Sequence, residues 1–467
     1  MLKREIWNEL VKWKERKHHP LIIKGLRQVG KTFIVRKFGE EYYKNTVYID
    51  LRSNKTIHKA FSEDFDVNQM ILYITANISS ARFIEGKTLL ILDEIQDCPN
   101  ARSSLKYWDK DGRFDVIATG SFLGVKGFRT PYERGIPVGC EEQMIMYPLS
   151  FREFLDNQNL DISVIKYVEE KFKEKKKIDD IIHASLRNQY LRYLIVGGMP
   201  EVVEAFFHSY DLNRVRDIQR NIISSIKDDF GRYRDKNGND MVNETLKLRA
   251  EAALDSIPSQ LAKEYKKFQY SLVDVKGKAN EKAEGLDYIV DVGLVYKAYN
   301  TREISYPLEG AKNQNEFKVY YADTGLLISQ LDSDTPGKIL SGDLGAYKGA
   351  ITENMVAVSF IENGINLYYY HHPTGSPELD FLIEEDGNVT IVESKSSNGR
   401  ATSMKFVLAN PNRFGHHNAI KIADSNVGET SGYTTYPLYY LGFLPKRNKE
   451  NTLAPIDLKN IKAPVEE

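Results

Sequence analysis

Cysteine is scarce in this sequence, since only Cys98 and Cys140 occur among 467 residues. They do not form a Cys-x-x-Cys motif, so a disulfide framework and a zinc knuckle are both excluded. Long apolar runs are also missing, because the longest, such as residues 89–92, fall far short of the roughly 18 residues that cross a bilayer. We therefore expect a cytoplasmic protein with no membrane-spanning helix.

An excess of either charge is lacking as well. Lys and Arg number 64 and Asp and Glu number 65, which gives a formal net charge of −1. Any contact with DNA or RNA has to be local, because the molecule as a whole does not attract a polyanion. With 42% hydrophobic and 28% charged residues, the composition is that of a globular protein. The length suggests about three domains of roughly 150 residues each.

The first 20 residues lack the continuous apolar stretch of a signal peptide. Leu2, Ile6, Leu10 and Trp13 instead recur at the spacing of one helix face. This pattern predicts an amphipathic helix that docks on the first domain. Binding of that helix to a membrane surface is the alternative.

A glycine-rich loop follows the apolar run 21–23, and residues 33–38 after it have helical character. Residues 25–32 read Gly-Leu-Arg-Gln-Val-Gly-Lys-Thr, and the order strand, loop, helix with this spacing predicts a phosphate-binding loop for ATP. Lys31 would reach the β- and γ-phosphates, and Thr32 would bind Mg²⁺. The predicted nucleotide contacts are Gly25, Arg27, Gln28, Val29, Gly30, Lys31 and Thr32.

A second apolar strand, residues 87–94, ends in two acids. Because Mg²⁺ prefers hard oxygen ligands, Asp93 is predicted to join Thr32 in holding the metal. Glu94 is predicted to polarise the water that attacks the γ-phosphate. A plain strand end with solvated acids is the alternative.

A third strand, residues 114–118, leads into Thr119-Gly120-Ser121. The hydroxyls of Thr119 and Ser121 are predicted to face the γ-phosphate and sense its hydrolysis. Further strands are predicted at 46–51 and 143–147, with helical segments between them. Strands that alternate with helices indicate a parallel sheet.

These motifs, together with the segment 147–155 (Tyr-Pro-Leu-Ser-Phe-Arg-Glu-Phe-Leu), resemble a family of bacterial and archaeal AAA-type ATPases. In that family the ATPase is followed by a domain of unknown function that resembles a restriction-endonuclease fold. Residues 197–201 (Gly-Gly-Met-Pro-Glu) and 321–326 (Tyr-Ala-Asp-Thr-Gly-Leu) extend the resemblance over most of the chain.

One departure from the family concerns the arginine that a neighbouring subunit supplies to the γ-phosphate. Members often carry a basic residue after a Pro-Val-Gly segment, but here residues 137–139 are followed by Cys140. Arg129 and Arg134 lie nearby as alternatives, with an ordinary surface role as their other interpretation. A homo-oligomer is therefore left open.

The predicted fold class is α/β, with an AAA-type parallel sheet followed by smaller parts. A helix from Pro200 to Phe230 belongs to a helical lid, and helices at 260–268 and 279–290 with a strand at 294–298 suggest a winged helix. That winged helix would read DNA or serve in packing or oligomerisation. The predicted divisions are 1–155 (ATPase core), 156–235 (lid), 236–330 (winged-helix-like), 331–445 (nuclease-like) and 446–467 (tail).

A hairpin is predicted over residues 378–395 around Asp386-Gly387. If Glu385 pairs with Asn388, Asp380 lies opposite Glu393, and two opposed carboxylates repel unless a cation sits between them.

Asp380, Glu393 and Lys395 then resemble the D…E-x-K set of a restriction-type nuclease, with both acids on Mg²⁺ and Glu353 completing the set. The alternative is a hairpin in which Lys395 pairs with Glu378.

Two functions follow as hypotheses. The first is an ATP- and Mg²⁺-dependent ATPase whose nucleotide state controls a nuclease-like domain acting on DNA or RNA. The second is an ATP-gated switch or scaffold that binds a protein partner through a catalytically silent C-terminal domain.

Overall fold

The computed structural model describes residues 1–61, 66–121, 139–234, 240–263, 266–342, 347–372, 374, 377–396, 399–430 and 432–447. The elements up to residue 146 are α1 (Glu5–Glu15), β1 (Leu21–Gly25), α2 (Lys31–Tyr42), β2 (Asn45–Asp50), α3 (Val67–Asn77), β3 (Thr88–Asp93), α4 (Pro99–Asp111), β4 (Asp115–Gly120) and β5 (Glu142–Met146).

The middle elements are α6 (Phe151–Asp156), α7 (Ile162–Lys173), α8 (Asp180–Val196), α9 (Pro200–Ser209), α10 (Leu212–Asp228), β6 (Arg232–Arg234), β7 (Asp240–Val242), α11 (Glu244–Leu261) and α12 (Ala279–Asp291). Those after them are β8 (Val295–Thr301), α13 (Leu308–Ala311), β9 (Lys312–Tyr321), α14 (Thr324–Ser329), α15 (Thr335–Ser341), α16 (Tyr347–Glu362), β10 (Tyr368–His371), β11 (Glu378–Glu385), β12 (Asn388–Lys395), α17 (Thr402–Leu408), α18 (Pro411–Phe414), β13 (Asn418–Ala423), β14 (Gly428–Thr430) and β15 (Tyr433–Pro437).

The N-terminal sheet has the strand order β2-β3-β4-β1-β5, and every neighbouring pair is parallel. The predicted parallel sheet is therefore confirmed. Alternate side chains of its strands enter two separate apolar clusters, one shared with α1 and α2 and the other with α3 and α4. Because parallel strands end at the same edge, the segments after β1, β3 and β4 come together there.

Helix α1 lies where the sequence predicts an amphipathic helix. Leu10 and Trp13 are fully buried in the cluster that also contains Phe38 of α2. Just before α1, the guanidinium of Arg4 donates to the carbonyl oxygens of Val29 (3.2 Å) and Tyr147 (2.6 Å). These contacts favour docking on the first domain over binding to a membrane surface.

The predicted helix 200–230 is two helices, which corrects that expectation. Pro200 is the first residue of α9, as expected, but α9 ends where Tyr210 adopts a left-handed conformation with φ of 53°. Asp211 then caps α10 by accepting from the backbone N–H groups of Asn213 and Arg214. The reason is local, because an aspartate at an N-cap satisfies the free donors of a new helix.

Three of the segments that carry the family resemblance meet in the interior. The backbone N–H of Leu149 donates to the carbonyl oxygen of Gly198 (2.7 Å), and the N–H of Gly198 donates to the carboxylate of Asp323 (2.6 Å). Asp323 also caps α14 through Leu326 N–H (2.8 Å). A side chain at Gly198 would lie 2.2 Å from the Leu149 carbonyl oxygen, so this close approach of two chain segments requires glycine.

The segment between residues 244 and 263 differs from the predicted helix at 260–268. Helix α11 instead continues through Pro258 and ends at Leu261. Proline lacks the N–H that would bond the carbonyl four residues earlier. That carbonyl belongs to Leu254, and it accepts a hydrogen bond from the Tyr321 hydroxyl at 3.2 Å. A contact distant in sequence therefore offsets the missing helical bond.

The C-terminal sheet has the order β14-β15-β13-β12-β11-β10-β8-β9. The strand at 294–298 was predicted as part of the wing of a winged helix. It corresponds to β8, which pairs antiparallel with β9 and parallel with β10, so it belongs to the larger sheet. A winged helix is not confirmed. Strands on both sides of the predicted division at residue 330 share this sheet, so a domain boundary at that residue would divide the sheet. The sequence did not reveal this, because the paired strands β8 and β10 are far apart along the chain.

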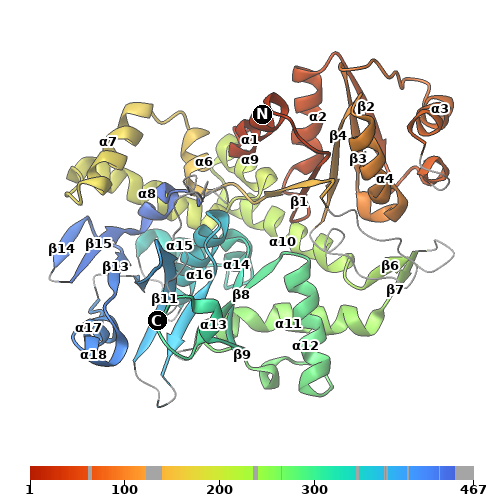
Figure 1. Cartoon of the computed structure of the whole chain (residues 1–467). Helices are drawn as coiled ribbons and strands as arrows, with labels where there is room; N and C mark the ends of the chain where they lie inside the picture. The colour runs from red at the N-terminus through yellow and green to blue at the C-terminus, as the bar shows by residue number, and fades with distance from the viewer. Residues whose placement is uncertain are drawn as a thin grey trace, which may run out of the picture.

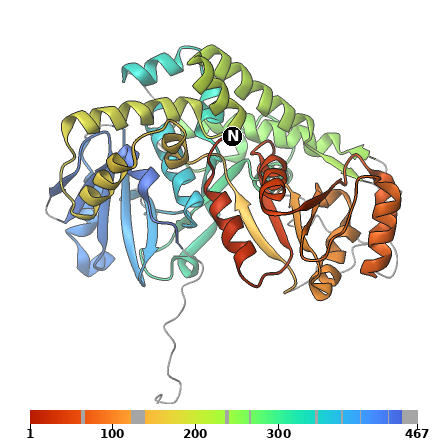
Figure 2. The same cartoon turned by 90° about the horizontal axis from the view of Figure 1, so that it is seen from above.

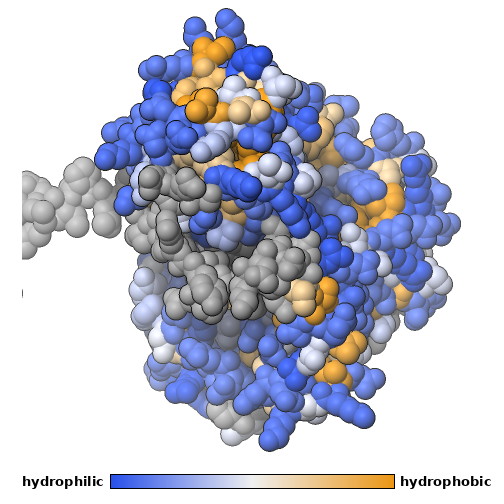
Figure 3. All heavy atoms as spheres, turned by 90° about the vertical axis from the view of Figure 1, so that its right-hand side faces the viewer, coloured by the Kyte–Doolittle hydropathy of each residue, from blue (hydrophilic) through white to orange (hydrophobic). Residues whose placement is uncertain are grey.

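The two sheets lie at opposite ends of the molecule, and the yellow and green helices of the middle segment run along one side of both (Figures 1 and 2). One apolar cluster is continuous from the α2 face of the N-terminal sheet through these helices to α16 and β11. The face in Figure 3 is mainly hydrophilic, with small separate apolar patches among the coloured residues. Within the described ranges no helix is long and apolar enough to span a bilayer.

Candidate functional site

The loop between β1 and α2 has the geometry that a phosphate-binding loop requires. A side chain at Gly25 would lie 2.2 Å from the carbonyl oxygen of Met146 on the adjacent strand β5. Gly30 caps α2 with φ of 98°, a conformation that glycine adopts without strain. The loop therefore leaves the sheet tightly and presents the backbone N–H groups at the start of α2, where an anion is favoured.

Lys31 is buried at the base of this loop. Its ammonium group donates to the carbonyl oxygens of Gly25 and Leu26, both at 3.0 Å. Burial lowers the pKa of Lys31, while the nearby carboxylates of Glu94 and Asp93 oppose that shift. A bound phosphate would offer this ammonium group oxygen atoms in place of the two carbonyls.

Asp93, at the end of β3, is the centre of a group of hydroxyls. The hydroxyl of Thr32 lies 3.0 and 2.9 Å from its two carboxylate oxygens. The hydroxyls of Thr119 and Tyr48 also donate to this carboxylate, the latter at 2.8 Å. The structure thus brings together three residues that the sequence analysis selected, and it adds Tyr48 from β2.

Tyr48 was missed because nothing in its own segment distinguishes it from an ordinary strand tyrosine. Burial and the bond to Asp93 raise the pKa of the Tyr48 hydroxyl, so it acts as a hydrogen-bond donor. The guanidinium of Arg36 lies 4.9 Å from the centre of its ring. The only signal in the sequence was its strand alternation with the buried Val47 and Ile49.

Glu94 follows Asp93 directly and has a left-handed backbone with φ of 54°. This conformation turns the chain sharply at the edge of the sheet. The side-chain amide of Gln96 donates to its carboxylate. Burial raises the pKa of Glu94, with Lys31 acting in the opposite direction. Such a carboxylate is a stronger base than an exposed one.

Other predicted residues of this site have different surroundings. Ser121 follows β4 directly. The carbonyl oxygen of Val29 accepts a hydrogen bond from the guanidinium of Arg4. The side-chain amide of Gln28 donates a hydrogen bond to the hydroxyl of Ser225 at 3.5 Å. Arg129 and Arg134 lie outside the described residues.

Arg27 of the loop contacts the helical segment instead of pointing away from the protein. It forms an ion pair with Asp229 and donates to the carbonyl oxygen of Ser225 at 3.3 Å. The guanidinium groups of Arg52 (3.6 Å) and Arg232 (3.3 Å) also face Asp229. Burial, together with the like charges of Arg52 and Arg232, lowers the pKa of Arg27. Three cations therefore share one carboxylate beside the phosphate-binding loop.

The second predicted site lies on the β11–β12 hairpin. The strands pair from Phe381 with Val392 to Glu385 with Asn388, which confirms the predicted register. Asp386 and Gly387 both have positive φ, as their two-residue turn requires.

Lys395 lies between the two acids of that hairpin, with Nζ 2.7 Å from Glu393 and 3.6 Å from Asp380. The expected alternative pairing of Lys395 with Glu378 is not found, because Glu378 binds Lys318 at 2.8 Å.

Both acids are well shielded from water. The backbone N–H of Ser394 donates to Asp380 at 2.9 Å. Burial raises the pKa of Asp380, and burial together with the charge of Asp380 raises the pKa of Glu393 to about 7. Glu353, on α16, is 5% exposed and accepts a hydrogen bond from the Tyr320 hydroxyl at 3.1 Å. Within the described ranges no group of three or more His, Cys, Asp or Glu side chains is arranged to hold a metal ion.

Three family models match parts of the chain. Residues 17–155 match an AAA domain. Residues 187–336 and 348–441 match two domains of unknown function, DUF8612 and DUF4143. The AAA part of the predicted resemblance is confirmed, whereas the nuclease-like part stays a prediction. No curated protein matches the chain.

Solved structures show weak similarity. A Walker-type ATPase of Pyrococcus abyssi is 13% identical over 71% of this chain and 96% of its own, with a TM-score of 0.40. A signal-transduction ATPase with a tetratricopeptide-repeat sensor from Pyrococcus horikoshii is 13% identical over 78% of this chain and 49% of its own, with a TM-score of 0.25. The Pif1 helicase of Candida albicans is 12% identical over 40% of this chain and 47% of its own, with a TM-score of 0.21.

This chain thus spans about half the length of the second and third of these proteins. With TM-scores below 0.5, none of the three similarities bears on its function. The family match and the parallel sheet with its phosphate-binding loop agree, however. Residues 17–155 form a P-loop domain of the AAA type.

Proposed function

We propose that this protein binds ATP with Mg²⁺ at the loop between β1 and α2 and hydrolyses it. The observation that carries the proposal is the carboxylate of Asp93, which accepts the hydroxyls of Thr32 and Thr119 beside the buried ammonium of Lys31. The positive end of α2 and Lys31 would together hold the phosphates.

The residues around Asp93 fit Mg²⁺ chemically, because a carboxylate and a hydroxyl are the hard oxygen donors that this ion prefers. Asp93 and Thr32 would hold the ion, with phosphates and water as its remaining ligands. When bound, Mg²⁺ neutralises charge on the β- and γ-phosphates. Glu94, with its raised pKa, would orient the attacking water and accept its proton.

Substitution of Lys31 by alanine tests the binding step. Lys31→Ala should abolish the rise in melting temperature that ATP and Mg²⁺ give the wild-type protein, because the loop loses its charge at the β/γ-phosphates. Lys37→Ala is the matched control, since Lys37 lies half exposed on the same helix and pairs with Glu40 three residues further on. Undiminished stabilisation of Lys31→Ala by ATP would contradict the proposal.

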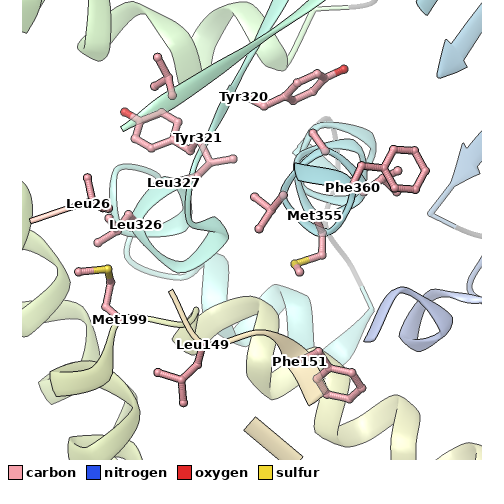
Figure 4. Close-up of a cluster of buried hydrophobic side chains, with 14 of the residues drawn as sticks. Leu26, Leu149, Phe151, Met199, Tyr320, Tyr321, Leu326, Leu327, Met355 and Phe360 are labelled. Carbon is pink, nitrogen blue, oxygen red and sulfur yellow. The ribbon is translucent and has the colours of Figure 1, made fainter. Parts of the chain in front are cut away.

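A second proposal concerns the C-terminal part, which we infer acts as an ATP-gated switch or scaffold for a protein partner. Direct contacts join the P-loop to other parts of the chain, notably the ion pair of Arg27 with Asp229. Leu26 of the same loop belongs to one apolar cluster with Met199 and with Leu326 of α14 (Figure 4). A change at the loop could reach the C-terminal sheet through these contacts.

The competing role is cleavage of DNA or RNA by the Asp380, Glu393 and Lys395 set. A nicking assay with Mg²⁺ or Mn²⁺ separates the two roles. If the wild-type protein and Asp380→Ala cut equally little DNA and RNA, the switch is supported. Cleavage that Asp380→Ala abolishes would establish the nuclease.

A further inference from the structure

A buried lysine lies among the acids of the C-terminal cluster, and the sequence analysis did not select it. Lys318, on β9, is 1% exposed. Its ammonium group is 2.8 Å from Glu378 and 3.9 Å from Glu353. It also lies 4.8 Å from the centre of the Tyr369 ring, a further stabilising contact for a cation. The charge of Lys318 is therefore held by two carboxylates and one aromatic face.

A second lysine reaches the same acids from another direction. Lys266, which follows α11, forms an ion pair with Glu353. The other oxygen of Glu353 accepts the Tyr320 hydroxyl. Both oxygens of the acid that would complete a metal site are therefore engaged by groups of the protein itself.

The charges of this cluster nearly balance without an ion. Its carboxylates are Glu353, Glu378, Asp380 and Glu393, and its ammonium groups are Lys266, Lys318 and Lys395. Each carboxylate lies within 4.0 Å of at least one ammonium group.

A divalent cation would have to displace some of these ammonium groups, because it needs the same carboxylate oxygens and repels lysines close by. One oxygen of Glu393 is buried without a hydrogen-bond partner. A single carboxylate oxygen beside the ammonium of Lys395 does not make a divalent site.

We propose that the ammonium group of Lys318, with those of Lys266 and Lys395, occupies the position that a divalent cation needs in this cluster. The cluster is then a closed network of ion pairs, and the domain keeps its structure without metal. This inference does not depend on ATP binding, because it concerns a site on the other sheet. A network closed in this way would leave the C-terminal domain catalytically silent.

The network predicts a gain of metal binding when its central cation is removed. Lys318→Met keeps the length of the side chain but leaves Glu353 and Glu378 without that counter-charge. A buried excess of negative charge attracts a cation. The substitution should therefore create a divalent site that the wild-type protein lacks.

The test is a titration of the full-length protein with Mn²⁺ in the absence of nucleotide, followed by electron paramagnetic resonance and by thermal melting. Wild-type protein and Asp380→Asn should bind Mn²⁺ to the same extent. Lys318→Met should bind one additional Mn²⁺ per chain and melt at a higher temperature when Mn²⁺ is present. The double variant Lys318→Met/Asp380→Asn should lose that additional ion.

Lys297→Met is the matched control, because Lys297 lies on the neighbouring strand β8 and pairs with Asp287 away from the cluster. It should gain no Mn²⁺. The proposal is overturned if the wild-type protein binds an Mn²⁺ ion that Asp380→Asn abolishes. This comparison needs no lysine variant, so it decides the question even if Lys318→Met fails to fold. A folded Lys318→Met that gains no ion would overturn it as well.

Discussion

Asp93 and Glu94 are neighbours in sequence but have different surroundings, and the difference supports the separate roles that we propose for them. Asp93, at the end of β3, accepts hydrogen bonds from three hydroxyl groups. Glu94 turns away from the strand through its left-handed backbone and has a pKa raised by burial. A carboxylate fixed by donors suits metal binding, and one with a raised pKa suits proton transfer.

At the residue scale, Glu94→Gln should separate ATP binding from hydrolysis. The amide keeps the shape of the side chain but cannot accept a proton from water. We expect the turnover number to fall about 10²- to 10⁴-fold, as is typical when a general base is removed, while stabilisation by ATP and Mg²⁺ is retained. Phosphate release and thermal melting of the same preparations measure the two effects. If the variant turns over ATP as fast as the wild-type protein, Glu94 is not the general base.

At the scale of elements, the end of α10 is held to the P-loop through Asp229, which faces Arg27, Arg52 and Arg232. In Asp229→Asn these three cations lose their shared carboxylate beside the nucleotide. ATP should then bind about two- to fivefold more tightly, which corresponds to the roughly 0.5–1 kcal/mol of a partly exposed ion pair.

The neighbouring Asp228→Asn makes the same change in net charge and serves as the control. Its carboxylate forms no ion pair with these arginines in the part of the chain that the structure describes, although its charge also acts on Arg27. Titration calorimetry at two salt concentrations would measure both variants. Weaker ATP binding by Asp229→Asn would show that the ion pair instead holds the lid in its binding position.

The junction of Gly198 with α14 makes a pH-dependent contribution to stability. Burial raises the pKa of Asp323 to about 6, well above the ordinary value of an aspartate. The folded protein therefore binds this proton at a higher pH than the unfolded chain does. The contribution of Asp323 to stability is accordingly greatest at low pH and is lost as the pH rises through about 4 to 6.

Asp323→Asn should remove that dependence. Relative to the variant, the wild-type protein should gain about 1 kcal/mol of unfolding free energy between pH 7 and pH 5. Urea unfolding of both proteins at several pH values measures the difference between their unfolding free energies. The titration of all other groups cancels in this difference, because both proteins contain them. A constant difference across this range would show that the carboxyl stays ionised.

At the scale of the whole molecule, the main apolar cluster joins the N-terminal sheet to α14, α16 and the C-terminal sheet. Leu26 of the P-loop and Leu326 of α14 are both part of this cluster (Figure 4). Ordering of the loop by a nucleotide should therefore stabilise α14 as well.

We expect a non-hydrolysable ATP analogue with Mg²⁺ to slow amide hydrogen exchange in residues 26–32, 225–232 and 324–329. Mass spectrometry of the intact protein would detect the change, and Lys31→Ala should show none of it. Protection limited to residues 26–32 would mean that the nucleotide does not act on the rest of the molecule, and the proposed switch would be wrong.

The wider fold was only partly predictable, and the failures have a common cause. Pro258 is an ordinary helix breaker in sequence, yet Tyr321 takes up the carbonyl that it leaves free. The strand that became β8 is recognisable locally, but its parallel pairing with β10 is not. Likewise, no residue close to Asp229 in the sequence predicts its ion pair with Arg27. Each of these depends on a residue far away along the chain.

The sequence alone determined the features that depend on short-range chemistry. These are the spacing of Gly25, Gly30 and Lys31, the acids that end β3, and the register of the β11–β12 hairpin, which its two-residue turn imposes. The tertiary structure alone decided which cations besides Lys395 face the C-terminal acids. Lys318 and Lys266 come from segments more than 30 residues before Glu353, and only the packing of β9 and α16 in one domain brings their charges to it.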